Sequence, residues 1–141
     1  MAHQLILEEE LASVFTGKDL IQLPDAYRLA LVRYGPLVVS VLFPAALLAT
    51  VLNTENLSVL GTLTLHLKEG LSLLFLLASL ATGVAALPGL YRQTRCSWSR
   101  LYWAGLLHAV SAISTLDVGA LLLTFALGFY PLFQIRSYYN Q

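Results

Sequence analysis

Residues 70–91 read GLSLLFLLASLATGVAALPGLY, and no side chain in this run is ionisable before Tyr91. As a helix that rises 1.5 Å per residue, the run would extend about 33 Å, enough to cross a hydrocarbon core of about 30 Å. A second run, GPLVVSVLFPAALLATVL at residues 35–52, is also uncharged. These two runs predict transmembrane helices, and they indicate an all-α integral membrane protein.

The composition of the whole chain favours the same class. Of its 141 residues 57% are hydrophobic and 11% are charged, whereas a soluble domain carries roughly 25% charged residues. A domain of this size exposes much of its surface, so these few charges cannot keep it in water. The formal net charge of zero gives no field to attract a nucleic acid, and a single cysteine excludes an intrachain disulfide and a cysteine zinc cluster.

Residues 101–135 contain Asp117 as their single Asp, Glu, Lys or Arg, and one continuous helix would be about 52 Å long. That is too long for one pass, so we expect a break at residues 114–119, with Asp117 capping the helix that follows. The sequence therefore predicts four transmembrane helices, near residues 35–52, 70–91, 101–116 and 118–135.

Charged and aromatic residues orient these four helices. Four passes place the N-terminus, the loop at 92–100 and the C-terminus on one side, which then carries every basic residue except Lys68. By the positive-inside rule both termini are cytoplasmic, and we expect a bacterial plasma membrane or an equivalent bilayer. All seven tyrosines and both tryptophans fall near the same boundary, which predicts an interfacial aromatic belt. Residues 1–34 form a cytoplasmic segment in this scheme, and residues 35–141 form the bundle with a short tail.

The N-terminal residues 4–15 predict an amphipathic helix with Glu9 on its polar side. Helices that lie on lipid usually carry lysine and arginine there, whereas this one carries three consecutive glutamates. We therefore expect it to dock on protein, either on Arg92, Arg95 and Arg100 of the bundle or on a partner. The expected docking face consists of Leu7, Leu11, Val14 and Phe15.

Residues 57–67 alternate apolar and polar side chains, which is a strand-like period. A lone strand has no mate in a helical bundle, so we favour an irregular or helical lead-in to the second span. Pairing with a strand of a partner is the alternative.

Polar side chains follow one face of the third predicted helix, where Ala104, His108, Ser111 and Thr115 are spaced by four, three and four residues. A histidine inside a span often marks a binding or proton-transfer site. We therefore consider a small ligand, such as a quinone headgroup, bound by His108, Ser111 and Thr115. The alternative, which we favour, is that this face hydrogen-bonds neighbouring helices.

Small residues spaced by four predict close helix contacts. In the fourth predicted helix they are Ala120, Thr124 and Gly128, flanked by Phe125 and Phe129, which we expect to be exposed. Gly105 and Ala109 repeat the step on the third helix, and Ala81, Ala85 and Gly89 repeat it on the second. Such ridges pack inside one bundle or against another subunit, and for the 120/124/128 ridge we favour the second.

The function expected from these features is that of a non-catalytic accessory, scaffold or assembly subunit of a larger membrane complex. A homo-oligomeric small transporter or channel is the alternative, although the first span lacks the acidic residue that ion-coupled carriers use. An intramembrane enzyme would need a nucleophile with a base or a metal cluster, and neither pattern is present. We expect no metal and no cofactor, and we expect the partners to be the lipid bilayer and either another membrane protein or further copies of this chain.

Overall fold

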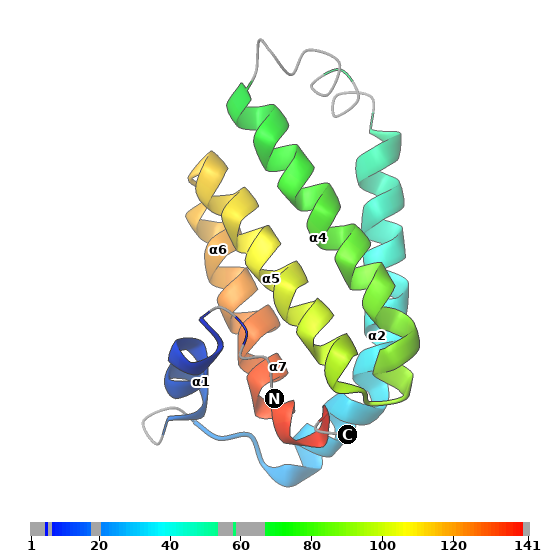
Figure 1. The fold of residues 1–141 in the computed structure, drawn as a ribbon, viewed down its shortest axis with the longest axis vertical. Coiled ribbons are helices and arrows are strands. Elements are labelled where there is room, and N and C mark those ends of the chain that lie inside the picture. The colour runs from blue at the N-terminus through cyan, green and yellow to red at the C-terminus, as the bar shows by residue number, and fades with distance from the viewer. Residues whose placement is uncertain (1–4, 6, 18–20, 54–57, 59–66, 140–141) are drawn as a thin grey trace.

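The computed structural model describes residues 5, 7–17, 21–53, 58 and 67–139, and all regular structure in these residues is helical (Figure 1). The long helices of this part of the chain are α2 (Asp25–Leu52), α4 (Leu67–Tyr91) and α5 (Arg95–Thr115). A short helix, α1 (Glu8–Thr16), precedes them. After α5 the chain forms four short consecutive elements: α6 (Val118–Leu123), the π-helix η1 (Thr124–Phe129), α7 (Tyr130–Gln134) and the 3-10 helix η2 (Arg136–Tyr139).

The helices form a bundle in which α4 and α5 make the most extensive pair (Figure 1). α2 lies against α4, and the stretch α6–η1–α7 packs on α5. α1 packs on α7, so the first helix of the described chain lies at the same end of the bundle as its C-terminal residues. Most of the segment at 57–67, for which the sequence left a lead-in or a strand open, lies outside the described residues.

α2 and α4 are long and apolar enough to cross a membrane, with 28 and 25 residues. The most apolar window of 18 residues has a mean hydropathy of 2.2 in α2 and 2.1 in α4. Only 6% of that window is buried inside the bundle in α2, against 39% in α4. α2 is therefore the peripheral helix of the pair, and most of its apolar surface faces away from the rest of the chain.

Two helices begin earlier than their hydropathy predicts. α2 starts at Asp25 rather than near residue 35, passing through Pro36 and across the expected segment boundary at residue 34. α5 starts at Arg95 rather than at 101, so the expected loop at 92–100 shrinks to the turn between α4 and α5. The physical reason is that hydropathy locates the part of a helix that suits lipid, whereas backbone hydrogen bonding continues into polar residues until a turn stops it.

The predicted break before the last helix is confirmed. Leu116 ends α5 in the left-handed conformation, with φ of 58°, and Asp117 caps α6 by accepting a hydrogen bond from the backbone N–H of Ala120 at 2.9 Å. A left-handed residue at the end of a helix turns the chain so that following N–H groups bond the last free carbonyls. An acidic cap accepts a hydrogen bond from a free backbone N–H at the start of the next helix. The chain therefore reverses direction within a few residues.

The last predicted helix is not a uniform α-helix, because a π-helical turn occupies Thr124–Phe129. The N–H of Tyr130 bonds the carbonyl of Phe125, five residues back. Pro131 follows directly and has no N–H to donate, so the hydrogen-bonding pattern has to change near it. Contrary to expectation, Phe129 is buried at 1% exposure, and Phe125 is only half-exposed.

The core lies at the end of the bundle where α1 docks, and it is largely aromatic. The Trp98 and Tyr102 rings stack with centroids 5.6 Å apart, and Phe15 of α1 stacks on Phe133 at 5.7 Å. Trp98 Nε1 donates to the carbonyl of Leu132 at 3.0 Å, which satisfies the indole N–H inside the core. The belt predicted from the aromatic residues does not include all of them, because Trp98, Tyr102 and Tyr139 are buried in the core, while Tyr27, Tyr34, Tyr91 and Trp103 are exposed.

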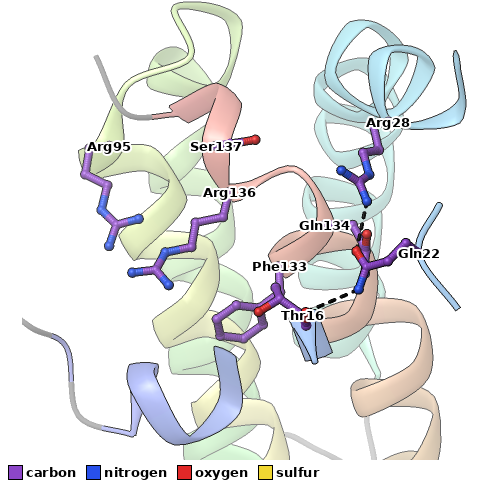
Figure 2. A pocket seen from close by; sticks show the side chains of 8 residues that line it. All are labelled: Thr16, Gln22, Arg28, Arg95, Phe133, Gln134, Arg136 and Ser137. Carbon is purple, nitrogen blue, oxygen red and sulfur yellow. Dashed lines mark hydrogen bonds between the residues drawn. The ribbon is translucent and has the colours of Figure 1, made fainter. Parts of the chain in front are cut away.

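Basic side chains gather at this same end (Figure 2). Arg28 comes from α2, Arg95 from the first turn of α5 and Arg136 from η2, and all three line one pocket. Tyr139, the last residue of η2, is buried, and burial raises the pKa of its hydroxyl, so it adds no negative charge at neutral pH.

Candidate functional site

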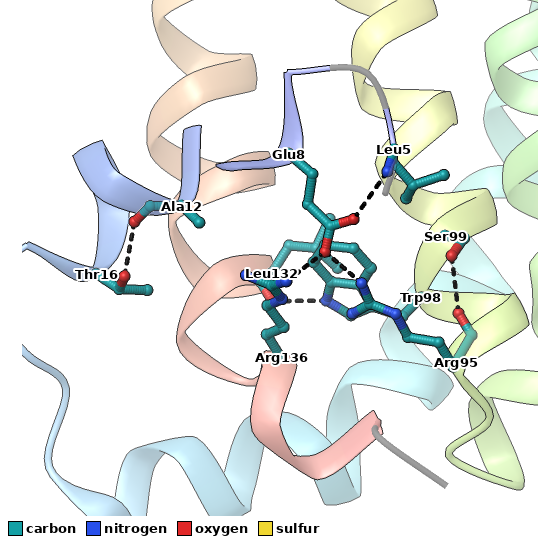
Figure 3. Close-up of polar contacts among 9 residues, drawn as sticks. All are labelled: Leu5, Glu8, Ala12, Thr16, Arg95, Trp98, Ser99, Leu132 and Arg136. Carbon is teal, nitrogen blue, oxygen red and sulfur yellow. Dashed lines mark hydrogen bonds and ion pairs between the residues drawn. The ribbon is translucent and has the colours of Figure 1, made fainter. Parts of the chain in front are cut away.

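The polar end of the bundle is organised by Glu8, whose side chain is 2% exposed (Figure 3). Its Oε1 atom accepts hydrogen bonds from Nη2 of Arg95 and, at 2.6 Å, from Nη2 of Arg136. Its other oxygen, Oε2, accepts from the backbone N–H of Leu5 at 3.2 Å. A buried carboxylate is costly unless it is paired and hydrogen-bonded in this way, so the contacts fix where α1 can sit.

The guanidinium groups of Arg95 and Arg136 both lie over the Trp98 ring. The Arg95 guanidinium carbon lies 4.4 Å from the Trp98 ring centroid, and that of Arg136 lies at 5.8 Å. Planar guanidinium groups stack well on indole, and each such contact adds a favourable cation–π term. The result is a layered arrangement of an aromatic ring, two cations and one carboxylate.

α1 therefore docks on the bundle's own arginines, one of the two alternatives that the sequence left open. Of the three arginines expected there, Arg95 binds Glu8, whereas Arg100 donates to the carbonyl of Ala85 at 2.7 Å and Arg92 is exposed. Sequence reasoning missed Arg136, because nothing local relates it to α1. The signal available was that it is a basic residue directly after the last predicted span, on the side that the sequence predicts to hold the N-terminal helix.

The expected docking face of α1 needs a correction. Phe15 is buried and Leu11 is half-buried, but Leu7 and Val14 are 52% and 56% exposed. The face that packs consists of Glu8, Ala12 and Phe15. The helix is rotated relative to its apolar stripe because the ion pairs of Glu8 bring that carboxylate inward.

Part of the polar face of α5 makes hydrogen bonds to α4. Ser111 is buried and donates to the carbonyl of Ser72 on α4 at 2.9 Å, while the two hydroxyl oxygens are also 2.9 Å apart. Ser79 of α4 donates to the carbonyl of Ala104 at 2.7 Å. These hydrogen bonds hold α4 against α5, as small polar residues do between membrane helices.

His108 and Thr115 take different positions from Ser111. His108 is half-buried, and the Thr115 hydroxyl donates back to its own helix, to the carbonyls of Ser111 and Ala112. The ligand site proposed at these three residues stays a prediction. Within the described ranges, no three His, Cys, Asp or Glu side chains cluster as metal ligands would.

The small residues of the predicted ridges separate into covered and open positions. Ala109 and Thr124 are buried, and Ala120 is half-buried. Gly105 packs on Phe129, since a Cβ at this position would lie 3.0 Å from the ring atom Cζ. Gly128 is exposed, and among the described atoms a Cβ there would meet only Cγ2 of Thr124, in the same helical stretch, at 3.9 Å.

Gly128 opens into an apolar groove of about 700 Å³ between α2, α5 and the η1–α7 stretch. The wall from α2 includes Leu31, Val38 and Leu42, and Leu132 of α7 lies opposite. Gly128 contributes backbone in place of a side chain and so widens the groove at this point, whereas Gly105 lines the groove but is covered by the Phe129 ring on its Cβ side. No family model, curated protein or solved structure matches this chain.

Proposed function

We propose that this chain is a non-catalytic accessory subunit that crosses a membrane four times and binds a transmembrane helix of a larger partner protein. The four crossings would be α2, α4, α5 and the stretch α6–η1–α7. Two of these helices have the length and hydropathy of membrane spans, and the hairpin at Asp117 gives the last two a short external turn.

The distribution of charge supports an orientation with both termini in the cytoplasm. Arg28, Arg95 and Arg136 lie at the end of the bundle that also holds α1. Lys68 belongs to the first turn of α4, at the opposite end (Figure 1). Basic residues are retained on the cytoplasmic side of bacterial membranes, so the arginine-rich end would face inward.

One observation carries the assignment of function: Gly128 is open, and it lies in an apolar groove beside the peripheral helix α2. In a bilayer the hydrophobic effect does not drive helices together, because lipid is as apolar as leucine. Association then depends on close backbone approach, which glycine permits and larger residues prevent. A groove that exposes the backbone at Gly128 suits a helix that packs closely.

The test is purification of the full chain in mild detergent from its native membrane, with identification and stoichiometry of the proteins that accompany it. We expect a larger membrane protein in fixed stoichiometry. Gly128→Leu fills the groove and should abolish this association while the chain still inserts and folds.

The matched control is Ala126→Leu, which adds similar bulk at an exposed position of η1 that does not line the groove. It should leave the association intact. Isolation of the chain solely as a homo-oligomer, or equal loss of the partner in both variants, would contradict the proposal. The first of these results would favour the transporter alternative.

A further inference from the structure

The pocket between α1, α2, α5 and the C-terminal residues is a second cavity, about 600 Å³ in volume and distinct from the apolar groove. Figure 2 shows Arg95 and Arg136 together on one side of Phe133, with Arg28 on the other side next to Gln22 and Gln134. The three arginines therefore come from separate parts of the chain and line the same cavity.

The acidic groups near this pocket only partly neutralise it. Glu8 pairs with both Arg95 and Arg136, so one carboxylate serves two guanidinium groups. Asp25 lies 4.0 Å from Arg28, but its side chain is 93% exposed, so water screens most of that attraction. Arg28 otherwise donates to the neutral side chain of Gln22 at 2.9 Å. Among the described residues, the positive charge of the three arginines exceeds the negative charge that faces them.

Three of the residues that line this pocket also carry buried polar atoms without a hydrogen-bond partner in the described part of the chain, and these atoms suggest the chemistry of a ligand. Arg28 Nε and Arg95 Nη1 are buried donors without a hydrogen-bond partner among the described residues, and Gln134 Oε1 is a buried acceptor in the same condition. Gln134 is 4% exposed, and its amide is oriented because Nε2 donates to the carbonyl of Phe15 at 3.0 Å. Buried polar atoms left unsatisfied are costly and rare, so a ligand that pairs with all three would be stabilised.

We propose that this pocket binds a phosphate group that carries a neighbouring hydroxyl. The phosphate oxygens would accept from the arginines, and the hydroxyl would donate to Gln134 Oε1. Arginine forks match phosphate geometry, and a tetrahedral anion presents oxygens to opposite walls of a cavity as a planar carboxylate does not. The headgroup of phosphatidylglycerol has both groups, as does free glycerol phosphate. The lipid as source rests on the proposed membrane setting, whereas the phosphate chemistry does not.

The experiment is calorimetric titration of the purified full chain in a neutral detergent with three short-chain lipids and one soluble phosphate. Phosphatidylglycerol carries the charge and the hydroxyl, phosphatidylmethanol carries the charge alone, and phosphatidylcholine has no net charge. Glycerol phosphate tests the soluble source. We expect phosphatidylglycerol to bind about three- to tenfold more tightly than phosphatidylmethanol, as one neutral hydrogen bond allows, and phosphatidylcholine not to bind.

Arg28→Gln should weaken the binding of phosphatidylglycerol about tenfold or more, because a charge-assisted hydrogen bond is lost. Arg33→Gln is the matched control: Arg33 lies on the same helix outside the pocket, with its guanidinium 5.5 Å from the Tyr34 ring. Arg28→Lys keeps the charge without the fork and should give an intermediate loss, which provides a second variant if Arg28→Gln does not fold.

Binding of glycerol phosphate with the same response to Arg28 would support the pocket with a soluble ligand. If neither phosphatidylglycerol nor glycerol phosphate binds, or if Arg28→Gln and Arg33→Gln weaken binding equally, the proposal is overturned. Gly128→Leu should leave this binding unchanged, so failure of the partner groove and failure of the phosphate pocket are distinguishable.

Discussion

Glu8 and Arg136 form an ion pair between the first and last helices of the described chain, with Oε1 of Glu8 2.6 Å from Nη2 of Arg136. The carboxylate side chain is 2% exposed and the guanidinium side chain 36% exposed. The negative charge is therefore withdrawn from water while the positive charge stays partly hydrated. This asymmetry makes α1 depend on the arginines more than the arginines depend on α1.

Replacing Glu8 tests that dependence. Glu8→Gln removes the charge that holds Arg95 and Arg136, and we expect a loss of about 1–2 kcal/mol of stability, between the values for surface and fully buried pairs. The measurement is thermal unfolding in detergent. Glu10→Gln changes an exposed glutamate of the same helix and should have little effect. Equal unfolding temperatures for Glu8→Gln and the unaltered chain would mean that α1 is held by its apolar contacts alone.

Gly83 on α4 accommodates the Phe43 ring of α2, since a Cβ at this position would overlap the ring. Gly83→Ala should push α2 away and cost about 1–3 kcal/mol, which is typical of overpacking. Gly128→Ala adds the same methyl group in open space and should change stability by much less. The double variant Gly83→Ala with Phe43→Ala should unfold no earlier than Phe43→Ala alone. A second loss added in the double variant would show that the ring is not the obstacle.

The cap at Asp117 can be tested by two substitutions. Asp117→Asn keeps an oxygen that accepts from Ala120 N–H and should be nearly neutral. Asp117→Leu removes it and should cost about 0.5–2 kcal/mol, visible as a lower unfolding temperature. If Asp117→Asn were as damaging as Asp117→Leu, the charge itself, rather than the hydrogen bond, would be required.

The single cysteine reports the orientation of the bundle. Cys96 is exposed in the first turn of α5, next to the arginine-rich end. In the proposed orientation a membrane-impermeant maleimide should label it in inverted vesicles and leave it unlabelled in intact cells. Cys96→Ser is the control for non-specific labelling. Modification from the outside of intact cells would reverse the proposed topology.

Local features of the sequence predicted much of the helical layout. The apolar run at 70–91 became α4 with nearly the expected ends, and Asp117 capped the helix after a turn. Both depend on short-range physics: the length of an apolar run, and a side chain that bonds an amide three residues away. The early start of α5 at Arg95 was missed because residues 95–100 include two arginines and two serines, and such polar residues do not prevent helix formation.

The candidate site was less predictable, because its parts come from distant segments. The sequence indicated that an acidic N-terminal helix should meet arginines, and Arg95 does bind Glu8. It gave no reason to choose Arg136, or to place Arg28 on the opposite wall of the same pocket.

What the sequence determined by itself was the helical class, the apolar runs with the length of spans, and the position of the last hairpin, because each is fixed by residues within one helix or one turn. Only the tertiary structure decided that Trp98 is buried while Trp103 is exposed, and that Gly105 is covered while Gly128 is open. The two tryptophans lie on one helix, α5, and the two glycines lie on α5 and η1, so residue type alone does not separate the members of either pair. The exposure of the two members of each pair differs because burial depends on which helix packs opposite. The packing of helices is set by contacts between residues far apart in the chain.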